Sequence, residues 1–359
     1  MNPVKYIVTI SLISSIGIIV VALTNYLVDP SSIYHEKTSK VDQFINALLS
    51  SEHGLVLQQG GGLNGREISS ALAKHSTDTD CFVIGSSHIM QISSFRTNKS
   101  IKRYCPSLIN LGVDGASLED YLALSESVLA NTSNVKTIVF GVDPWALNYY
   151  RDSAWVHYKN QYYSMINRLE NEQYIPKENN YQLFFNLISR DYFIQSVKSL
   201  LSSNTKEIVY APKFDTIVGI ESSVKLPDGS IIYSHKSNND ISYTSISGLH
   251  DYKMNKKSII NQKSVEIFTK LMQYLKTRFN VIFVLTPYHN NVWKYPNQTI
   301  MTAMLSVEKK IHQIAKKLNI IVVGSYDPNK VGCKTDEFYD AMHAKDTCLS
   351  KLKRVRIQK

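Results

Sequence analysis

Five short apolar segments, separated by helical or polar stretches, are the feature of this chain that most restricts its fold. They are Cys81–Gly85, Ser107–Gly112, Thr137–Gly141, Val281–Leu285 and Ile320–Val323. Apolar residues at helical spacing fill 118–129, 264–279 and 300–318. Continuous apolar strands that alternate with helices are typical of a parallel sheet covered on both faces. We therefore predict an α/β domain with a central five-stranded parallel sheet, in which ligands bind beyond the carboxyl ends of the strands.

The N-terminal segment from Tyr6 to Val28 contains no charged residue. It is long enough to cross a bilayer, which requires about 20 apolar residues. A cleaved signal peptide is the competing interpretation, but residues 25–30 contain no small-x-small cleavage pattern. We predict a single uncleaved transmembrane anchor over residues 1–29. Lys5 beside the short N-terminal tail favours a domain outside the cytoplasm, which in a bacterium means the inner membrane with a periplasmic domain.

The rest of the chain divides into four predicted regions. Residues 30–77 are expected to be a juxtamembrane linker, with a helical patch at 41–49 and a Gly-rich turn at 60–62. The α/β domain is predicted over 78–145 and 259–359. Between its parts, residues 146–258 form an insertion whose start is rich in aromatic residues: Tyr149, Tyr150, Trp155, Tyr158, Tyr162 and Tyr163. These rings suit either a lid that stacks on sugars or the core of a subdomain.

The net charge of +10 restricts the partners of the protein only weakly. No basic stretch alternates with aromatic residues, so we expect no nucleic-acid partner. The charge is compatible with a location near an anionic envelope surface. The one dense basic run is expected to be a solvated C-terminal tail; it comprises Lys351, Lys353, Arg354, Arg356 and Lys359.

The cysteines and histidines do not predict a metal site. The four cysteines contain no CxxC pair, and His53, His75, His157 and His250 have no companions at ligand spacing. We predict no metal and no cofactor. In an oxidising compartment two disulfides become available, Cys333 with Cys348 around residues 340–343, and Cys81 with Cys105 between the first two strands. Four buried free thiols are the alternative.

Residues suited to nucleophilic catalysis follow the predicted strands. Ser87, in Gly-Ser-Ser-His after the first strand, lies on a turn that would expose its side chain. The base that a Ser hydroxyl needs is available in Asp340-Ala-Met-His343, where the carboxylate can hold one imidazole nitrogen while the other faces the nucleophile. Gly115 follows the second strand and can present its N–H to the site, and Asp143 follows the third.

Two further histidines are expected near the same edge of the sheet. His88 follows Ser87, and we expect it either to line the pocket or to lie on the surface at the start of a helix. His289 follows the fourth strand and is a candidate for contact with substrate.

In order along the chain, the segments around Ser87, Gly115, Asp143 and Asp340–His343 resemble the conserved blocks of the SGNH/GDSL hydrolase superfamily. The resemblance covers residues 80–145 and 280–345. It implies a three-layer flavodoxin-like domain, Ser87 as the nucleophile, Asp340 and His343 as its partners, and the N–H groups of Ser87 and Gly115 as oxyanion donors. Asp143 departs from the pattern, because the family has an oxyanion-binding Asn there and an ionised carboxylate would oppose the developing charge. Three explanations for Asp143 remain open: burial keeps it protonated, it has a structural or substrate-binding role, or hydrolysis is weakened.

The N-terminal span and the Gly-x-Asp-Pro-Trp segment make the chain similar to anchored SGNH-like proteins of bacterial surface polysaccharides. This implies a serine-dependent O-acyl esterase or transferase, acting on acetyl groups of an envelope polysaccharide. A transferase would need a multispanning membrane partner that supplies the acyl donor. The alternatives are a catalytically weakened subunit that binds polysaccharide or a membrane acyltransferase, and a structural protein of the inner membrane.

Overall fold

The computed structural model describes most of the chain. The described residues are 3–29, 34–35, 38–57, 63–76, 78–96, 99–131, 134–148, 153–170, 184–185, 187–201, 208–212, 222–234, 254, 259–293 and 298–354. The predicted turn at 60–62 lies outside them, as do Tyr149, Tyr150, Arg356 and Lys359.

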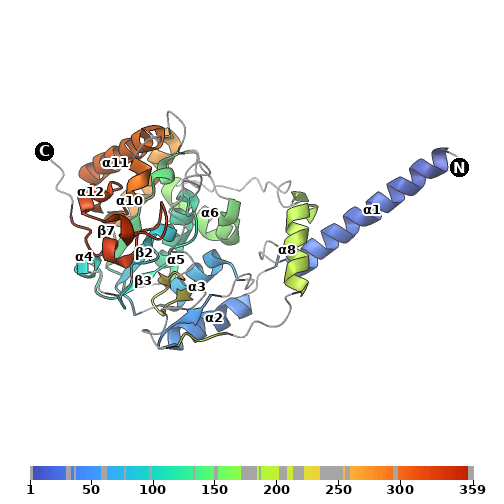
Figure 1. The fold of residues 1–359 in the computed structure, drawn as a ribbon, viewed down its shortest axis with the longest axis horizontal. Helices are drawn as coiled ribbons and strands as arrows, with labels where there is room; N and C mark the ends of the chain where they lie inside the picture. Colours follow the sequence, from blue (N-terminus) through green and yellow to red (C-terminus); the bar gives the residue numbers. More distant parts are fainter. Residues whose placement is uncertain are drawn as a thin grey trace.

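A five-stranded sheet in the order β3-β2-β4-β7-β8 forms the centre of the protein (Figure 1). Its strands are β2 (Cys81–Ile84), β3 (Leu108–Asn110), β4 (Thr137–Gly141), β7 (Asn280–Leu285) and β8 (Ile321–Gly324). All neighbouring strands are parallel. The predicted α/β class with a five-stranded parallel sheet is thus confirmed, and each strand ends within two residues of its predicted bounds.

Helices lie around this sheet. The α-helices are α1 (Pro3–Val28), α2 (Thr38–Ser50), α3 (Gly65–His75), α4 (Lys99–Lys102), α5 (Leu118–Asn131), α6 (Lys159–Glu170), α8 (Arg190–Leu201), α10 (Gln262–Lys276), α11 (Gln298–Leu318), α12 (Pro328–Val331) and α13 (Asp346–Leu349). The short 3₁₀ helices are η1 (Ser87–Ile89), η2 (Pro144–Leu147), η3 (Ser153–Tyr158), η7 (Asn290–Trp293) and η8 (Thr335–Glu337). A small antiparallel sheet joins β1 (Leu55–Val56), β5 (Val224–Lys225) and β6 (Ile231–Ile232).

Side-chain alternation along the strands separates two hydrophobic cores. Successive residues of a strand point to opposite faces, so Phe82 and Phe140 join the larger core while Val83 and Val139 join the smaller one. The larger core includes buried residues of α5, α10 and α11. The smaller core is closed largely by the segment from Cys333 to Leu352. The C-terminal segment therefore carries half of the predicted triad and also covers one face of the sheet.

Helices α2 and α3 belong to the folded domain, although we expected a linker over residues 30–77. Apolar residues at helical spacing give α2 and α3 one apolar face each, and Ile45, Leu48 and Leu72 are buried in the larger core. Arg66 on α3 is buried as well, because the Asp120 carboxylate accepts from its Nε at 2.7 Å. The structure therefore uses both helices as part of the α/β domain's core.

Residues 153–170 of the predicted insertion pack on the α/β domain, whereas α8 contacts α1. Tyr158 is buried and donates its hydroxyl proton to Asp120. The rings of Trp155 and Tyr162 lie 4.7 Å apart and pack against the larger core. Of the two roles considered for these aromatic rings, Tyr158 takes the core role, and Trp155 and Tyr162 pack partly buried against the core.

Helix α1 projects from the domain and is long and apolar enough to span a membrane (Figure 1). Its C-terminal end contacts α8 through polar groups. The Asn25 side-chain amide donates to the Leu187 carbonyl at 2.7 Å, and Tyr192 donates its hydroxyl proton to Asp29 at 2.6 Å. Helix α8 is thereby fixed beside the point where α1 ends.

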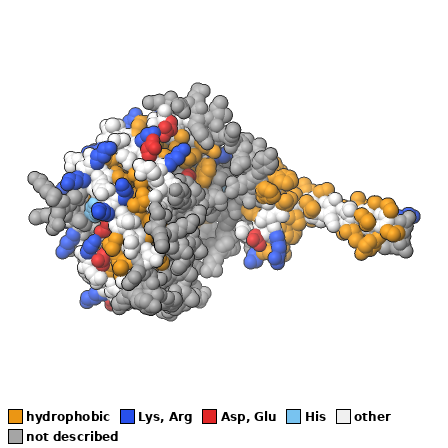
Figure 2. Space-filling model, turned by 90° about the horizontal axis from the view of Figure 1, so that it is seen from above, with side chains coloured by type: hydrophobic (Ala, Val, Ile, Leu, Met, Phe, Trp, Pro, Cys, Tyr) orange, Lys and Arg blue, Asp and Glu red, His pale blue; other side chains and the backbone are white. Residues whose placement is uncertain are grey.

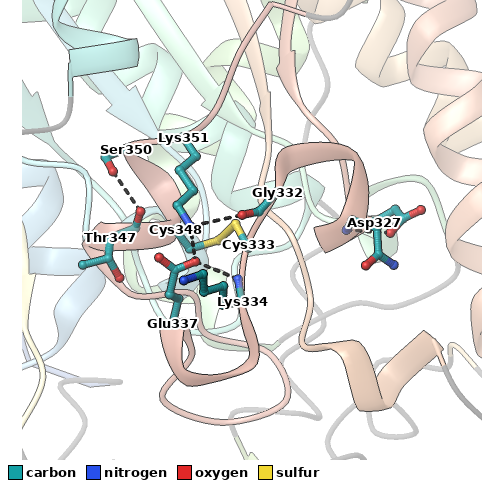
Figure 3. Close-up of a disulfide and its surroundings, with 10 residues drawn as sticks. Asp327, Gly332, Cys333, Lys334, Glu337, Thr347, Cys348, Ser350 and Lys351 are labelled. Carbon is teal, nitrogen blue, oxygen red and sulfur yellow. Dashed lines mark hydrogen bonds and ion pairs between the residues drawn. A yellow bond between two sulfur atoms is a disulfide. The ribbon is translucent and has the colours of Figure 1, made fainter.

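The C-terminal segment is fixed by a disulfide and by β8, while the Lys353 and Arg354 side chains of the predicted solvated run are exposed and that of Lys351 is partly buried. Cys333 and Cys348 form a disulfide with their Cα atoms 5.1 Å apart, and Lys351 reaches across it to Glu337 (Figure 3). A second disulfide joins Cys81 to Cys105. The Lys353 carbonyl accepts from the Gly324 N–H at 2.9 Å, because the edge strand β8 has backbone groups to pair.

Candidate functional site

The turn that carries Ser87 begins where β2 ends. Ser86 is the N-cap of η1, and its side-chain oxygen accepts from the His88 N–H at 3.2 Å. Ser87 is therefore the first residue of a short helix at the carboxyl end of a central strand. This is the edge at which a parallel α/β sheet binds its ligands.

Glycines at the ends of three strands make room for this turn. A Cβ atom on Gly141 would lie 2.0 Å from Cγ2 of Ile89, and one on Gly85 would lie 2.8 Å from Cγ1 of the same side chain. A Cβ on Gly112 would lie 3.0 Å from its Cδ1. Ile89 occupies the space that side chains would fill, and η1 can therefore sit directly on the sheet.

Ser87, His343 and Asp340 form a continuous hydrogen-bonded chain. Ser87 Oγ lies 2.8 Å from His343 Nε2, and His343 Nδ1 lies 2.7 Å from Asp340 Oδ2. The carboxylate can only accept, so Nδ1 carries the proton and Nε2 is left to accept from the Ser87 hydroxyl. The histidine side chain is 24% exposed, so the site can be reached from solvent. This is the geometry of a nucleophile, a general base and the group that orients the base.

Asp340 stays ionised over a wide pH range. Burial by itself would raise its pKa, but hydrogen bonding and charge attraction from His343, with the N–H groups of Met342 and His343, lower the pKa to about 2. Those two N–H groups donate to Oδ1 at 2.7 and 2.8 Å. The carboxylate therefore keeps the imidazole in one tautomer and one orientation.

The Asp143 carboxylate points to His88, which explains how a carboxylate is accommodated here. Asp143 Oδ1 accepts from His88 Nδ1 at 2.8 Å, and both side chains are almost fully buried. The Tyr121 hydroxyl lies 3.4 Å from Asp143 Oδ2. Asp143 thus has partners of its own and takes a structural position, one of the three roles we considered.

His88 is buried, so the surface position considered for it is wrong. Its ring lies 5.0 Å from the His343 ring and also contacts Trp145 and Tyr288 edge-on. Its Nε2 is buried without a hydrogen-bond partner among the residues that the structure describes. The His88 imidazole therefore packs against the His343 ring from inside the protein.

The two backbone N–H groups that the sequence predicts as oxyanion donors are those of Ser87 and Gly115. Within the described ranges, neither Ser87 N–H nor Gly115 N–H donates a hydrogen bond to the protein. Gly115 has a φ of 60°, the left-handed region that favours glycine. Its loop is held to the nucleophile turn, because Val113 N–H donates to the Gly85 carbonyl at 3.0 Å.

Two contributors to the site were missed in the sequence. Tyr233 follows β6 and donates to the Ser87 carbonyl at 3.0 Å, with its ring 5.7 Å from His343. Burial raises the pKa of this tyrosine well above its ordinary value, so it remains a donor. Arg66 donates to the Asp114 carbonyl at 3.3 Å and supports the Gly115 loop. Neither residue lies in a motif, and only the tertiary contacts reveal them.

His289 lies close to this region but is buried. Its N–H donates to the Ala341 carbonyl at 3.0 Å, and its ring contacts Phe338. A fully buried ring cannot contact a substrate from solvent, so the predicted role in substrate contact is not supported. His289 instead supports the loop that carries Asp340 and His343.

No metal site accompanies these residues. Across the described ranges, no group of three or more His, Cys, Asp or Glu side chains is placed to hold a metal ion. The chemistry that the arrangement supports is the transfer of an acyl group to Ser87.

Comparisons of the chain with protein-family models, with curated proteins and with solved structures found no match.

Proposed function

We propose that this protein is a membrane-anchored, SGNH-like serine enzyme that removes or transfers O-acyl groups on a bacterial envelope polysaccharide. The observation that carries the proposal is the chain from Ser87 Oγ through His343 to Asp340, with contacts of 2.8 and 2.7 Å. The strand order supports a flavodoxin-like fold, because strands numbered along this sheet run 2-1-3-4-5.

The residues support a two-step acyl transfer. Ser87 Oγ attacks the acyl carbonyl carbon while its proton passes to His343 Nε2. The oxygen that becomes negative is bound by the N–H groups of Ser87 and Gly115. His343 then returns the proton to the leaving sugar oxygen, which leaves an acyl-Ser87 ester. Water or a second sugar hydroxyl, activated by the same imidazole, releases the acyl group.

Location outside the cytoplasm is part of the proposal. Helix α1 is suited to a single membrane crossing, and two disulfides are typical of an oxidising compartment. An envelope polysaccharide is the substrate class available there to a membrane-anchored enzyme. A multispanning partner would be needed to supply an activated acyl group for transfer.

Labelling with a fluorophosphonate tests the nucleophile. We expect the wild-type protein to be labelled, and Ser87→Ala and His343→Ala to remain folded but unlabelled. Ser306→Ala, which removes a serine hydroxyl from α11 outside the site, is the control and should be labelled. Saturable binding of glycan by a wild-type protein that resists labelling would instead support the non-catalytic subunit.

A second experiment distinguishes an esterase, which removes acyl groups from the glycan, from a transferase, which adds them. NMR of glycan O-acetylation should be compared in cells that carry the wild-type protein or Ser87→Ala. More acetylation in the variant indicates an esterase, and less indicates a transferase. Unchanged acetylation contradicts both enzymatic functions.

A further inference from the structure

Helix α8 and the residues just before it carry an unusual concentration of exposed apolar side chains. Outside α1, twelve described large hydrophobic residues are exposed, and six of them lie between 184 and 201. These six are Phe184, Phe185, Ile188, Ile194, Leu200 and Leu201. Figure 2 shows hydrophobic side chains gathered on α1 and on the adjoining part of the molecule.

The apolar residues of α8 form one stripe. At 100° per residue, the side chains of Phe193, Ile194, Val197, Leu200 and Leu201 span about 120° of the helix surface. Gln195 lies on the opposite side, and Asp191 and Lys198 lie between it and the stripe. The buried residues Tyr192 and Ser196 lie at the edge of the stripe and face the end of α1.

The contact with α1 places this stripe at a defined depth. The 23 residues from Tyr6 to Val28 span about 34 Å as a helix, slightly more than the roughly 30 Å hydrocarbon layer. Asn25 accepts from the Ser196 hydroxyl at 3.1 Å, so α8 meets α1 where the chain leaves the hydrocarbon. Helix α8 runs crosswise to α1 in Figure 1.

We propose that α8 lies in the membrane surface, with its apolar stripe among the lipid acyl chains and Lys198 toward the headgroups and water. An amphipathic helix of this kind binds at the boundary between headgroups and acyl chains. Together with α1, it would fix the tilt of the domain over the bilayer and therefore the height at which Ser87 is held.

Full-length protein in vesicles of phosphatidylethanolamine and phosphatidylglycerol tests this placement. All four native cysteines are in disulfides, so an added cysteine can be labelled selectively with an environment-sensitive dye. We expect Ile194→Cys and Leu201→Cys to show blue-shifted emission that nitroxide-bearing lipids quench. Lys198→Cys is the matched control and should be quenched by aqueous iodide instead.

Equal access of iodide to positions 194, 198 and 201 would overturn the proposal. Shielding of position 201 from both iodide and lipid quencher would also overturn it and would indicate contact with a second copy. Loss of the whole protein from the vesicles on carbonate extraction would refute the transmembrane anchor. Absence of lipid quenching at positions 194 and 201 alone would refute only the placement of α8, and the proposals for α1 and for Ser87 would stand.

A second and independent feature is a basic cavity between α11 and the C-terminal segment. It has a volume of about 470 Å³, within the range of ligand pockets. Five of its eleven lining residues are Lys or Arg, against 40 of 359 in the whole chain. These five are Lys309, Lys330, Lys351, Lys353 and Arg354.

Among the residues that the structure describes, acidic side chains pair with only two of these five basic residues. The one acidic residue of the cavity, Glu308, accepts from Lys330 and from the Ser325 hydroxyl, and Lys351 pairs with Glu337. Lys309, Lys353 and Arg354 have no ion pair with any described residue. Figure 1 shows α11, α12 and the C-terminus at the end of the molecule away from α1, so a membrane crossed by α1 would lie far from this cavity.

We infer that this cavity binds an anionic group, phosphate or carboxylate, of the polysaccharide chain, an inference that rests on the proposed function. The cavity includes Gly324 and Ser325, at the carboxyl end of β8. Strand β8 lies three strand positions from β2, which places this end about 14 Å from the turn of Ser87 on the same edge. A chain of a few sugars can therefore occupy both places.

Binding of soluble oligomers to the detergent-solubilised full chain tests the cavity. The probes are oligogalacturonate, a glycerol-phosphate oligomer and a neutral dextran oligomer. We expect binding of the anionic probes, weakened by salt, and a loss of about tenfold or more in the Lys353→Ala, Arg354→Ala double variant. Lys316→Ala with Lys317→Ala removes the same charge from α11 outside the cavity and should leave binding unchanged.

The inference would be overturned if the two double variants lost the same affinity for the anionic probes, or if the neutral dextran bound as tightly as those probes. Preference for one anionic probe would identify the anion as phosphate or carboxylate. Fluorophosphonate labelling of Ser87 in the cavity variant separates the two hypotheses, because labelling without anion binding refutes only the cavity.

Discussion

Each oxygen of Asp340 has a separate function. Oδ2 accepts from His343 Nδ1, and Oδ1 accepts from two backbone N–H groups. The carboxylate is therefore held by its own loop before it orients the imidazole. Serine nucleophiles depend on such orientation, because an imidazole in the wrong tautomer cannot accept the hydroxyl proton.

Asp340→Asn tests this dependence. An amide can donate to His343 Nδ1 and leave Nε2 protonated, so we expect kcat to fall by about 10³- to 10⁴-fold with the fold retained. Turnover of a small ester and circular dichroism measure the two effects. A variant with wild-type turnover would contradict the assigned role.

The low pKa of Asp340 also predicts that the protein loses stability at acidic pH. Its folded pKa of about 2 is below the ordinary 3.8, so the ionised form is stabilised by folding. This contribution is present above about pH 4 and is lost as the pH falls toward 2. The stability difference between wild type and Asp340→Asn, measured by urea denaturation, should be constant from neutral pH to about 4 and shrink below it. A difference that does not change between pH 4 and 2 would show that the folded pKa is not lowered.

The pair of Asp143 and His88 predicts a difference between two substitutions. Asp143→Ala leaves the buried His88 Nδ1 without its partner, which should lower the free energy of unfolding by about 1 to 3 kcal/mol. Asp143→Asn keeps an acceptor for that nitrogen and should cost less. Thermal denaturation of both variants gives the comparison, and equal losses would show that the volume of the side chain matters more than its oxygen.

At the scale of secondary-structure elements, the site depends on segments distant in sequence. The buried pair of Arg66 and Asp120 joins α3 to α5, and Arg66 also donates to the loop of Gly115. Asp120→Ala would remove the carboxylate that pairs with the buried Arg66 guanidinium, so we expect a loss of about 3 to 5 kcal/mol in chemical denaturation. Double substitution of Arg66 by Met and Asp120 by Leu should recover part of it, and no recovery would contradict the charge-based explanation.

The disulfide between Cys333 and Cys348 encloses the loop with Asp340 and His343. Its sequence separation of 15 corresponds to about 3 kcal/mol of stabilisation. We expect Cys333→Ser with Cys348→Ser to lose this amount in urea denaturation and to lower turnover, since the loop is then less restrained. The matched pair Cys81→Ser with Cys105→Ser should affect stability but spare the triad. Equal effects of both pairs on turnover would contradict a specific link to the triad.

At the scale of the whole molecule, the apolar helix α1 and the candidate site belong to separate parts of the structure. Helix α1 points away from the domain, while the sheet directs the carboxyl ends of its strands to one edge (Figure 1). The proposed orientation predicts that protease added to intact spheroplasts digests the domain. Protection until the membrane is permeabilised would place the domain in the cytoplasm and would contradict an envelope substrate.

Much of the fold follows from local patterns in the sequence. The strands of the central sheet were found because buried parallel strands are continuously apolar, and α1 because a membrane-spanning segment must be apolar over its whole length. Ser87, Asp340 and His343 were predicted from the side-chain types that nucleophilic catalysis requires and from the order of their segments along the chain. These features depend on short stretches of chain and can therefore be predicted from the sequence.

Other features were decided only by tertiary contacts. Helices α2 and α3 complete the core within a region that we predicted to be a linker, and His88 is a buried partner of Asp143. Tyr233 donates to Ser87 across 146 positions of sequence. Lys351, Lys353 and Arg354 line a cavity because the edge of β8 and a disulfide hold their segment. The sequence by itself determined which residues carry apolar surface and reactive groups; the tertiary structure decided which of them meet, because burial and hydrogen bonding depend on neighbours far away along the chain.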